Sequence, residues 1–125
     1  MREILFKAKR WDDGRWIEGY FVVSGITTRA FIVPKWDCSK TFIPVDLNTL
    51  CQYTGLADRN GVKIFEGDIV NIPGTKRPGI PAKVQYMIEQ CQFVIARNGY
   101  NPVWFSEYEP EKDIEVIGNI HDEED

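Results

Sequence analysis

Two carboxylates, Glu66 and Asp68, flank Gly67 and are the pair in this sequence that comes closest to a catalytic arrangement. Paired carboxylates can bind a cation or carry out general acid–base chemistry, as in a small hydrolase. At a tight turn, however, carboxylates more often accept hydrogen bonds from backbone N–H groups that the turn leaves exposed. We prefer this capping role for Glu66 and Asp68 and predict no catalytic residue at the turn.

The other reactive side chains are too few or too isolated for the common catalytic and metal sites. His121 is the only histidine and lies in an acidic tail, so a triad or a histidine metal site would have to run through that one residue. The three cysteines, Cys38, Cys51 and Cys91, include no close pair, which argues against a disulfide framework and a zinc site. We therefore predict that the protein is not an enzyme and has no metal or cofactor.

Three glycines at intervals of six residues, Gly55, Gly61 and Gly67, could suggest a phosphate-binding loop. Their spacing fits neither the dinucleotide-binding motif nor a Walker loop, and no helix follows whose N-terminus could hold an anion. We expect each of the three glycines to serve a turn instead.

Residues 52–70 are expected to form short strands joined by two turns. At the first turn, Asp58 can accept a hydrogen bond from the backbone two residues on, and Asn60 and Gly61 tolerate positive φ. Apolar residues on both sides of this turn predict a tight hairpin. Gly67 marks the second turn, before the next apolar segment begins. Three extended segments side by side indicate the corner of a small β-barrel or sandwich.

The same stretch resembles the signature of a known protein family, the YopX family of small phage and prophage proteins. Residues 1–22 and 114–122 resemble the opening and the end of that family. The resemblance implies a mostly β fold with an SH3-like barrel in its later part, a phage or prophage origin, and no assigned catalytic residue. The residues of the signature are Gln52, Tyr53, Thr54, Gly55, Asp58, Asn60, Gly61, Phe65, Glu66, Gly67 and Asp68.

The rest of the chain has the pattern of short strands separated by turns, because no stretch keeps helical periodicity over ten residues. Single helical turns are expected at 46–49, capped by Asp46 or Asn48, and over 106–113. The expected strands outside the central stretch cover residues 3–11, 15–23, 28–33, 41–45, 68–72, 82–88, 91–97, 103–105 and 114–120.

In the last expected strand, Ile114, Val116 and Ile120 should share one buried face, with Gly118 making room between them. This strand would close a barrel formed by the second half of the chain.

The expected architecture is all-β or nearly so, with an N-terminal β-hairpin unit over 1–50 packed on a C-terminal SH3-like β-barrel over 51–125. Hydrophobic residues make up 43% of the chain and aromatic residues 13%, which is enough for a packed core. The apolar runs are too short to span a membrane, and no apolar signal segment follows Met1. We therefore expect a cytoplasmic protein that does not contact the membrane.

Charge is unevenly distributed along the chain. Residues 106–125 contain nine acidic side chains and one basic one, a net charge of −8. Because the whole chain has a net charge of −4, the remaining residues carry +4. We interpret the acidic end as a solubilising terminus.

A binding surface is the strongest functional candidate in this sequence. The strand expected at 15–23 has apolar groups on both faces, so one face is expected to meet another layer or another chain. This pattern favours a non-enzymatic protein-interaction or self-assembling module, a homo-oligomer or the partner of a phage or host protein. The candidate interaction residues are Trp16, Tyr20, Trp36, Lys76 and Arg77.

The alternative is a weak single-stranded nucleic-acid binder. Aromatic rings of a small barrel would stack on bases, and the basic, Pro- and Gly-rich loop 73–81 would contact phosphates. Lys7, Lys9 and Arg10 add positive charge on the first strand. The isoelectric point of about 5.0 argues against this alternative, because affinity for phosphates is largely electrostatic.

Overall fold

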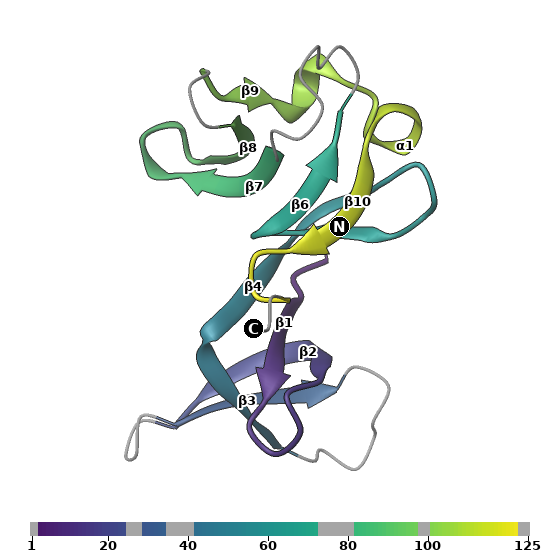
Figure 1. Ribbon diagram of the computed structural model, residues 1–125. Helices are drawn as coiled ribbons and strands as arrows, with labels where there is room; N and C mark the ends of the chain where they lie inside the picture. Colours follow the sequence, from purple (N-terminus) through teal and green to yellow (C-terminus); the bar gives the residue numbers. More distant parts are fainter. Residues whose placement is uncertain (1–2, 25–28, 35–41, 73–81, 98–100, 123–125) are drawn as a thin grey trace. The chain divides into compact units, whose positions relative to one another are not determined.

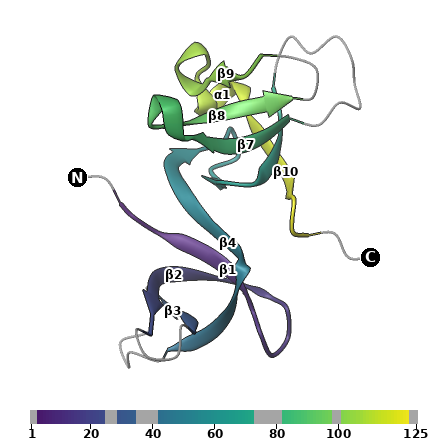
Figure 2. The ribbon, with the colours of Figure 1, turned by 90° about the vertical axis from the view of Figure 1, so that its left-hand side faces the viewer.

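A computed structural model describes residues 3–24, 29–34, 42–72, 82–97 and 101–122 (Figures 1 and 2). These residues form ten β-strands, two short 3-10 helices and one four-residue α-helix, so the predicted, nearly all-β class is confirmed. None of these helices is long and apolar enough to cross a membrane. The chain divides into two compact units, Met1–Tyr53 and Thr54–Asp125.

Unit 1 is a small closed ring of strands. It contains β1 (Phe6–Arg10), β2 (Trp16–Val23), β3 (Ala30–Pro34) and the first part of β4 (Ile43–Ala57). The pairings are antiparallel and run from β1 to β2, β3 and β4, and from β4 back to β1, as Figure 1 shows. Ring closure therefore occurs in the N-terminal unit, where the sequence predicted only hairpins.

The core inside this ring is small, because four strands enclose little space. The buried cluster consists of Ala8, Ala30, Ile32 and Val45, with larger partly buried side chains packed against it. The strands β2 and β3 lie close together at Gly19. A Cβ added there would lie 2.1 Å from the backbone oxygen of Val33, so only glycine fits.

Residues 46–49 lie within β4, so the helical turn predicted there is wrong. The side chain of Asp46 accepts the N–H of Asn48 at 3.0 Å. The hydroxyl of Thr49 donates to the carbonyl oxygen of Asp46 at 2.7 Å and accepts the N–H of Lys9 at 2.8 Å. The register of β1 against β4 shifts just before Lys9. These side-chain hydrogen bonds therefore stabilise a bulge and not a helical turn. The neighbouring strand β1 supplies hydrogen-bond partners that an isolated helical turn would lack.

Unit 2 contains an antiparallel sheet with the strand order β10-β6-β7-β8-β9. Its strands are β6 (Asp68–Asn71), β7 (Ala82–Met87), β8 (Gln92–Arg97), β9 (Val103–Trp104) and β10 (Glu115–Asn119). The short strand β5 (Lys63–Phe65) pairs with β4 instead. Pairings among these described strands do not close the sheet into a ring, so the SH3-like barrel stays a prediction.

Three short helices connect the later strands of unit 2. They are η1 (Ile88–Gln90), η2 (Phe105–Glu107) and α1 (Pro110–Asp113). The helical turn predicted over 106–113 is confirmed by α1, which begins at Pro110, where a missing N–H does no harm.

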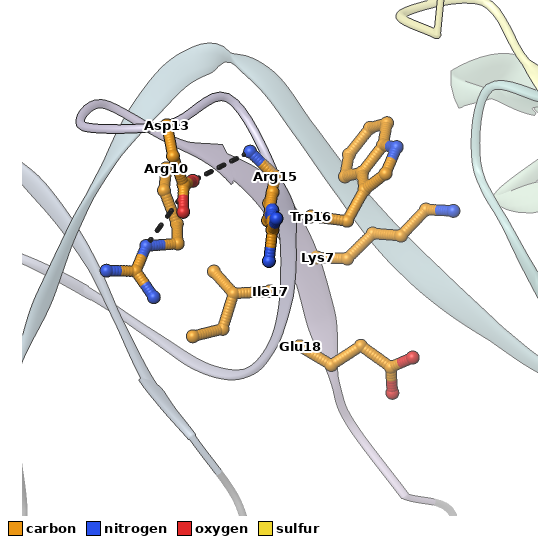
Figure 3. Close-up of a pocket in the computed structure, with 7 residues that line it drawn as sticks. All are labelled: Lys7, Arg10, Asp13, Arg15, Trp16, Ile17 and Glu18. Atoms are coloured by element: carbon orange, nitrogen blue, oxygen red, sulfur yellow. Dashed lines mark hydrogen bonds and ion pairs between the residues drawn. The ribbon is translucent and has the colours of Figure 1, made fainter.

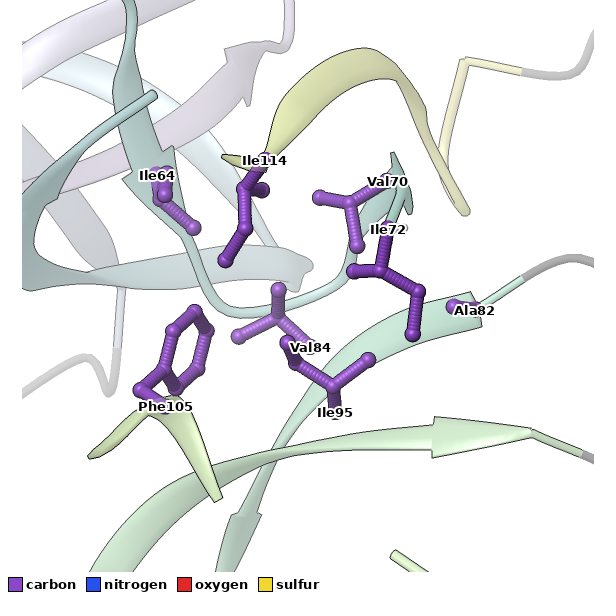
Figure 4. Packing of buried hydrophobic residues seen from close by; sticks show 8 residues of the cluster. All are labelled: Ile64, Val70, Ile72, Ala82, Val84, Ile95, Phe105 and Ile114. Carbon is purple, nitrogen blue, oxygen red and sulfur yellow. The ribbon is translucent and has the colours of Figure 1, made fainter. Parts of the chain in front are cut away.

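The core of unit 2 is larger than that of unit 1 and consists of branched aliphatic side chains around one phenylalanine (Figure 4). The side chains converge from the sheet, from β5, from η2 and from the residue that precedes β10. The cluster is Ile64, Val70, Ile72, Ala82, Val84, Ile95, Phe105 and Ile114.

A bulge in β10 changes which residues face this core. The register against β6 shifts between Val116 and Gly118. As a result Asn119 is buried, whereas Ile120 is 45% exposed, so the prediction that Ile120 shares the buried face of Ile114 is wrong. The prediction that Gly118 makes room between the buried side chains is also wrong. A Cβ atom added at Gly118 would lie 3.7 Å from its nearest neighbour, which is an ordinary van der Waals contact.

Candidate functional site

The family signature centres on the turn after β4, which Asp58 holds in place. Its Oδ1 atom accepts the backbone N–H groups of Asn60 at 2.8 Å and Val62 at 2.9 Å. Its Oδ2 atom accepts the N–H of Val116 at 2.8 Å. The bond from Asn60 is the one predicted from the sequence, and the bond from Val116 also fastens this turn to β10.

The buried carboxylate of Asp58 is stabilised in its charged form. Burial alone would raise its pKa, but the N–H donors of Val116, Val62 and Asn60, helped by the charge of Arg59, lower it below its usual value. A carboxylate with all its oxygens engaged in this way has a structural role. It presents no free acid or base.

Asp68 has a similar role at the second turn. It is buried, and its Oδ2 atom accepts the N–H of Phe65 at 2.7 Å, so it caps the turn as predicted. Its Oδ1 atom accepts the side-chain amide of Asn119 at 2.9 Å. Glu66 is partly buried beside it. Among the described residues, no buried side-chain nitrogen or oxygen lacks a hydrogen-bond partner, and no group of three or more His, Cys, Asp or Glu side chains could hold a metal ion.

Two of the three glycines serve turns as predicted. Gly61 and Gly67 have φ values of +79° and +85°, in the left-handed region that favours glycine. Gly55 instead lies inside β4 with a φ of +92°, so the turn predicted there is wrong and the residue marks an irregular point of the strand.

The remaining signature residues also build the strands. Thr54 donates its hydroxyl to the carbonyl oxygen of Ile64 at 2.8 Å. Gln52 pairs with Phe6 of β1, and the N–H of Tyr53 donates to the carbonyl oxygen of Leu5 at 2.8 Å. The signature therefore specifies backbone geometry.

Of the candidate interaction residues, Trp16 and Tyr20 both lie on the outer face of β2. Trp36, Lys76, Arg77 and the loop 73–81 lie outside the described residues, as does Cys38.

An open groove of about 630 Å³ lies beside Trp16 on the β1–β2 hairpin (Figure 3). The ammonium groups of Lys7 and Lys9 lie 4.6 Å and 5.5 Å from the centre of the Trp16 ring. Both lysines face the indole because Lys7 pairs with Glu18 and Lys9 pairs with Trp16 across the strands. We call this site the Trp16 groove; it is lined by Lys7, Arg10, Asp13, Arg15, Trp16, Ile17 and Glu18.

Ion pairs fix the hairpin turn at one end of the Trp16 groove. Arg10 donates two hydrogen bonds to the Asp12 carboxylate, at 3.0 Å and 2.7 Å, and also lies 3.7 Å from Asp13. The hydrogen bond from Arg10 lowers the pKa of Asp12. Asp13 in turn accepts the backbone N–H of Arg15 at 2.9 Å. Within the described residues, the Arg15 guanidinium makes no ion pair, so it adds a positive charge to the groove.

A second surface lies further along the same face of unit 1. Tyr20 of β2 pairs with Val33 of β3, and Val22 pairs with Phe31. Phe31 and Phe42 make an edge-to-face contact with their ring centres 6.1 Å apart. Tyr20 is 48% exposed and Phe42 is 52% exposed. We call these five residues the apolar patch. Tyr20 was identified from the sequence. The alternation of residues along β3, which places Phe31 and Val33 on its outer face, was the sequence signal that could have identified the rest of the patch.

Comparison with known proteins places the chain in one family. The family model described as YopX protein matches residues 32–124, most of the chain. No curated protein matches the chain. The matched range contains the whole signature, whereas β1 and β2, which form the Trp16 groove, precede it. The chain belongs to the YopX protein family.

Proposed function

We propose that this YopX family protein is a non-catalytic interaction module that associates with a second copy of itself through the apolar patch of unit 1. The observation that carries the proposal is that Tyr20 and Phe42 are each about half exposed, beside the cross-strand pair Val22 and Phe31. Contiguous exposed apolar residues of this kind commonly mark an interface.

The ring of unit 1 favours association through a face. Because β1 to β4 pair in a closed circle, the described part of unit 1 offers no free strand edge for strand addition. A patch of aromatic and β-branched side chains can pack on the same patch of a second copy about a two-fold axis. Burying one such aromatic side chain contributes roughly 1.5–3 kcal/mol, so a few of them are enough for a weak dimer.

The family resemblance also supports a proposal about the genetic origin of the protein and the compartment in which it acts. We take the protein to be encoded by a phage or prophage and to act in the cytoplasm of the bacterial host, where a phage or host protein could use the same patch. The saturated carboxylates Asp58 and Asp68 support a role without catalysis.

Sedimentation analysis over a range from low to high micromolar protein tests the proposal. We expect a concentration-dependent dimer in the wild type and monomers for Tyr20→Asp and Phe42→Asp. Ile88→Asp is the matched control, since Ile88 is 76% exposed but lies in unit 2. A wild type that stays monomeric throughout, or equal effects of Tyr20→Asp and Ile88→Asp, would contradict self-association through this patch.

A further inference from the structure

The turn that Asp58 holds in place contains two adjacent residues, Asn60 and Gly61, that can react with each other. Both are exposed, so water and hydroxide reach them. The backbone N–H of Asn60 is bonded to Asp58, but within the described part of the chain the side-chain amide of Asn60 makes no hydrogen bond. The amide carbon of Asn60 can therefore turn toward the backbone nitrogen of Gly61.

Gly61 leaves its backbone nitrogen open to this reaction. A Cβ atom added at Gly61 would meet no heavy atom of the described residues within 4 Å, apart from its chain neighbours. Because glycine has no side chain, its own residue does not crowd the nitrogen either. The nitrogen and the amide carbon belong to adjacent residues, so they react at the high effective concentration of an intramolecular step.

A hydrogen bond of the folded turn slows this reaction. The N–H of Gly61 donates to the carbonyl oxygen of Asp58 at 3.0 Å, and the nitrogen must leave this bond before it can attack. Exposed backbone hydrogen bonds open locally at a low cost in free energy. A bond of this kind reduces the rate by only about two- to tenfold.

We propose that Asn60 is a site of spontaneous deamidation. The Gly61 nitrogen gives its proton to hydroxide and forms a bond to the Cγ atom of Asn60. The bond from Cγ to the side-chain nitrogen breaks, and that nitrogen takes a proton from water and leaves as ammonia. Water then opens the succinimide ring on either side of its nitrogen, which gives aspartate or isoaspartate at position 60. The net reaction consumes one water and releases one ammonia, and no group is oxidised or reduced.

The other described asparagines lack this combination of features. Asn48 is also exposed, but it is followed by the β-branched residue Thr49, which crowds the attacking nitrogen. Asn71 is likewise followed by an isoleucine, and Asn101 by a proline, whose nitrogen has no proton to lose. Asn119 is buried, and both ends of its side-chain amide are hydrogen-bonded. We therefore expect the reaction to select Asn60 among these residues.

The reaction changes the turn that the family signature builds. In the isoaspartate product the main chain runs through the side-chain carbons of residue 60, so the backbone between the N–H groups of Asn60 and Val62 is longer. Oδ1 of Asp58 accepts both N–H groups, at 2.8 Å and 2.9 Å, and cannot keep both across the longer chain. The same carboxylate accepts the N–H of Val116, so its displacement loosens the connection between the turn and β10.

This inference is independent of self-association. The turn belongs to unit 2, whereas the apolar patch belongs to unit 1.

Peptide mapping by mass spectrometry tests the site on the full chain, incubated folded at neutral and mildly alkaline pH in isotopically labelled water. We expect residue 60 to be converted to labelled aspartate and isoaspartate many times faster than Asn48, at a rate that rises with the hydroxide concentration. The same chain incubated in urea should react about two- to tenfold faster, because the bond from Gly61 to Asp58 is then open. The mapping separates residue 60 from Asn98, which also precedes a glycine and lies outside the described residues.

Asn60→Gln is the matched control for the effect on unit 2. Its exposed side chain is longer by one carbon, which disfavours ring closure, and it leaves Asn98 in place. After incubation, the wild type should unfold at a lower urea concentration than before, and Asn60→Gln should change much less. Unincubated Asn60→Asp should be more stable than the isoaspartate form, because its backbone has the normal length.

Four results would overturn the proposal. Conversion of residue 60 in urea but not in the folded protein would show that the turn prevents the reaction. Equal rates at residues 60 and 48 would show that Gly61 does not direct it. An equal fall in stability of the wild type and Asn60→Gln on incubation would remove the link to the turn. Equal stability of Asn60→Asp and the isoaspartate form would mean that the longer backbone is not the cause.

Discussion

The carboxylate of Asp68 accepts a hydrogen bond of 2.9 Å from the side-chain amide of Asn119, which lies 51 positions further along the chain. Both side chains are buried. The other Asp68 oxygen accepts the N–H of Phe65, and the Asn119 side-chain oxygen accepts the N–H of His121 at 2.9 Å. This pair therefore joins the turn between β5 and β6 to the end of β10.

Removing either member of this pair should destabilise unit 2. Asp68→Ala removes the acceptor of the Phe65 N–H and of the Asn119 amide, and Asn119→Ala removes the acceptor of the His121 N–H and one donor to Asp68, so each variant should cost roughly 2–3 kcal/mol. The double variant should cost about 1 kcal/mol less than the sum of the two single variants, because the shared bond is counted once. Urea unfolding of the four proteins measures this coupling, with Glu111→Ala on exposed α1 as the control. Strictly additive effects would contradict a direct interaction.

Stability should depend on the ionisation of Asp58. The pKa of this group in the folded protein lies below its unfolded value of about 3.8, so the unfolded chain binds the proton more readily. The stabilisation is complete above the unfolded value and is lost as the pH falls through the folded value. Asp58→Asn should cost about 3 kcal/mol at neutral pH and much less in strong acid. Urea unfolding of wild type and Asp58→Asn from neutral pH to strong acid measures this difference. If the free energies of unfolding of the two proteins changed in parallel with pH, the role assigned to the Asp58 carboxylate would be wrong.

Gly19→Ala should open the ring of unit 1. The new Cβ would lie 2.1 Å from the Val33 oxygen and 2.9 Å from the Cα atom of Pro34, and neither backbone atom can move without separating β2 from β3. We expect a loss of about 3 kcal/mol or more. Gly118→Ala is the control, since its Cβ would meet only an ordinary contact. Thermal unfolding compares the two, and a Gly19→Ala protein as stable as Gly118→Ala would show that the strands are not so close.

Local chemistry could be predicted from the sequence and distant pairing could not. The bond from Asn60 to Asp58 was predictable because donor and acceptor are two residues apart. The bond from Val116 to the same carboxylate depends on how β10 meets the turn, which no local pattern encodes. Asp46 is a second example. Its side chain can accept the same kind of hydrogen bond at the start of a helix or at a bulge, and the pairing of β4 with β1 decides between the two.

The candidate site was predictable in part for the same reason. Trp16 and Tyr20 could be identified from their residue type and their alternation along one strand. The approach of Lys7 and Lys9 to the Trp16 ring depends on the register of β1 against β2. The exposure of Ile120 follows from one extra residue in β10, since a single bulge reverses the faces of a strand.

Cys91→Gly should stabilise the β7–β8 hairpin. Cys91 follows η1 with a φ of +55°, the left-handed conformation that costs a residue with a Cβ about 1 kcal/mol relative to glycine. The backbone bond from its N–H to the Ile88 oxygen, at 3.1 Å, does not depend on the side chain and should persist. We expect a gain of about 0.5–1 kcal/mol for Cys91→Gly and a loss for Cys91→Val, whose β-branched side chain is strained there. Urea unfolding under reducing conditions measures both. A destabilised Cys91→Gly protein would mean that the thiol makes a contact worth more than the backbone strain.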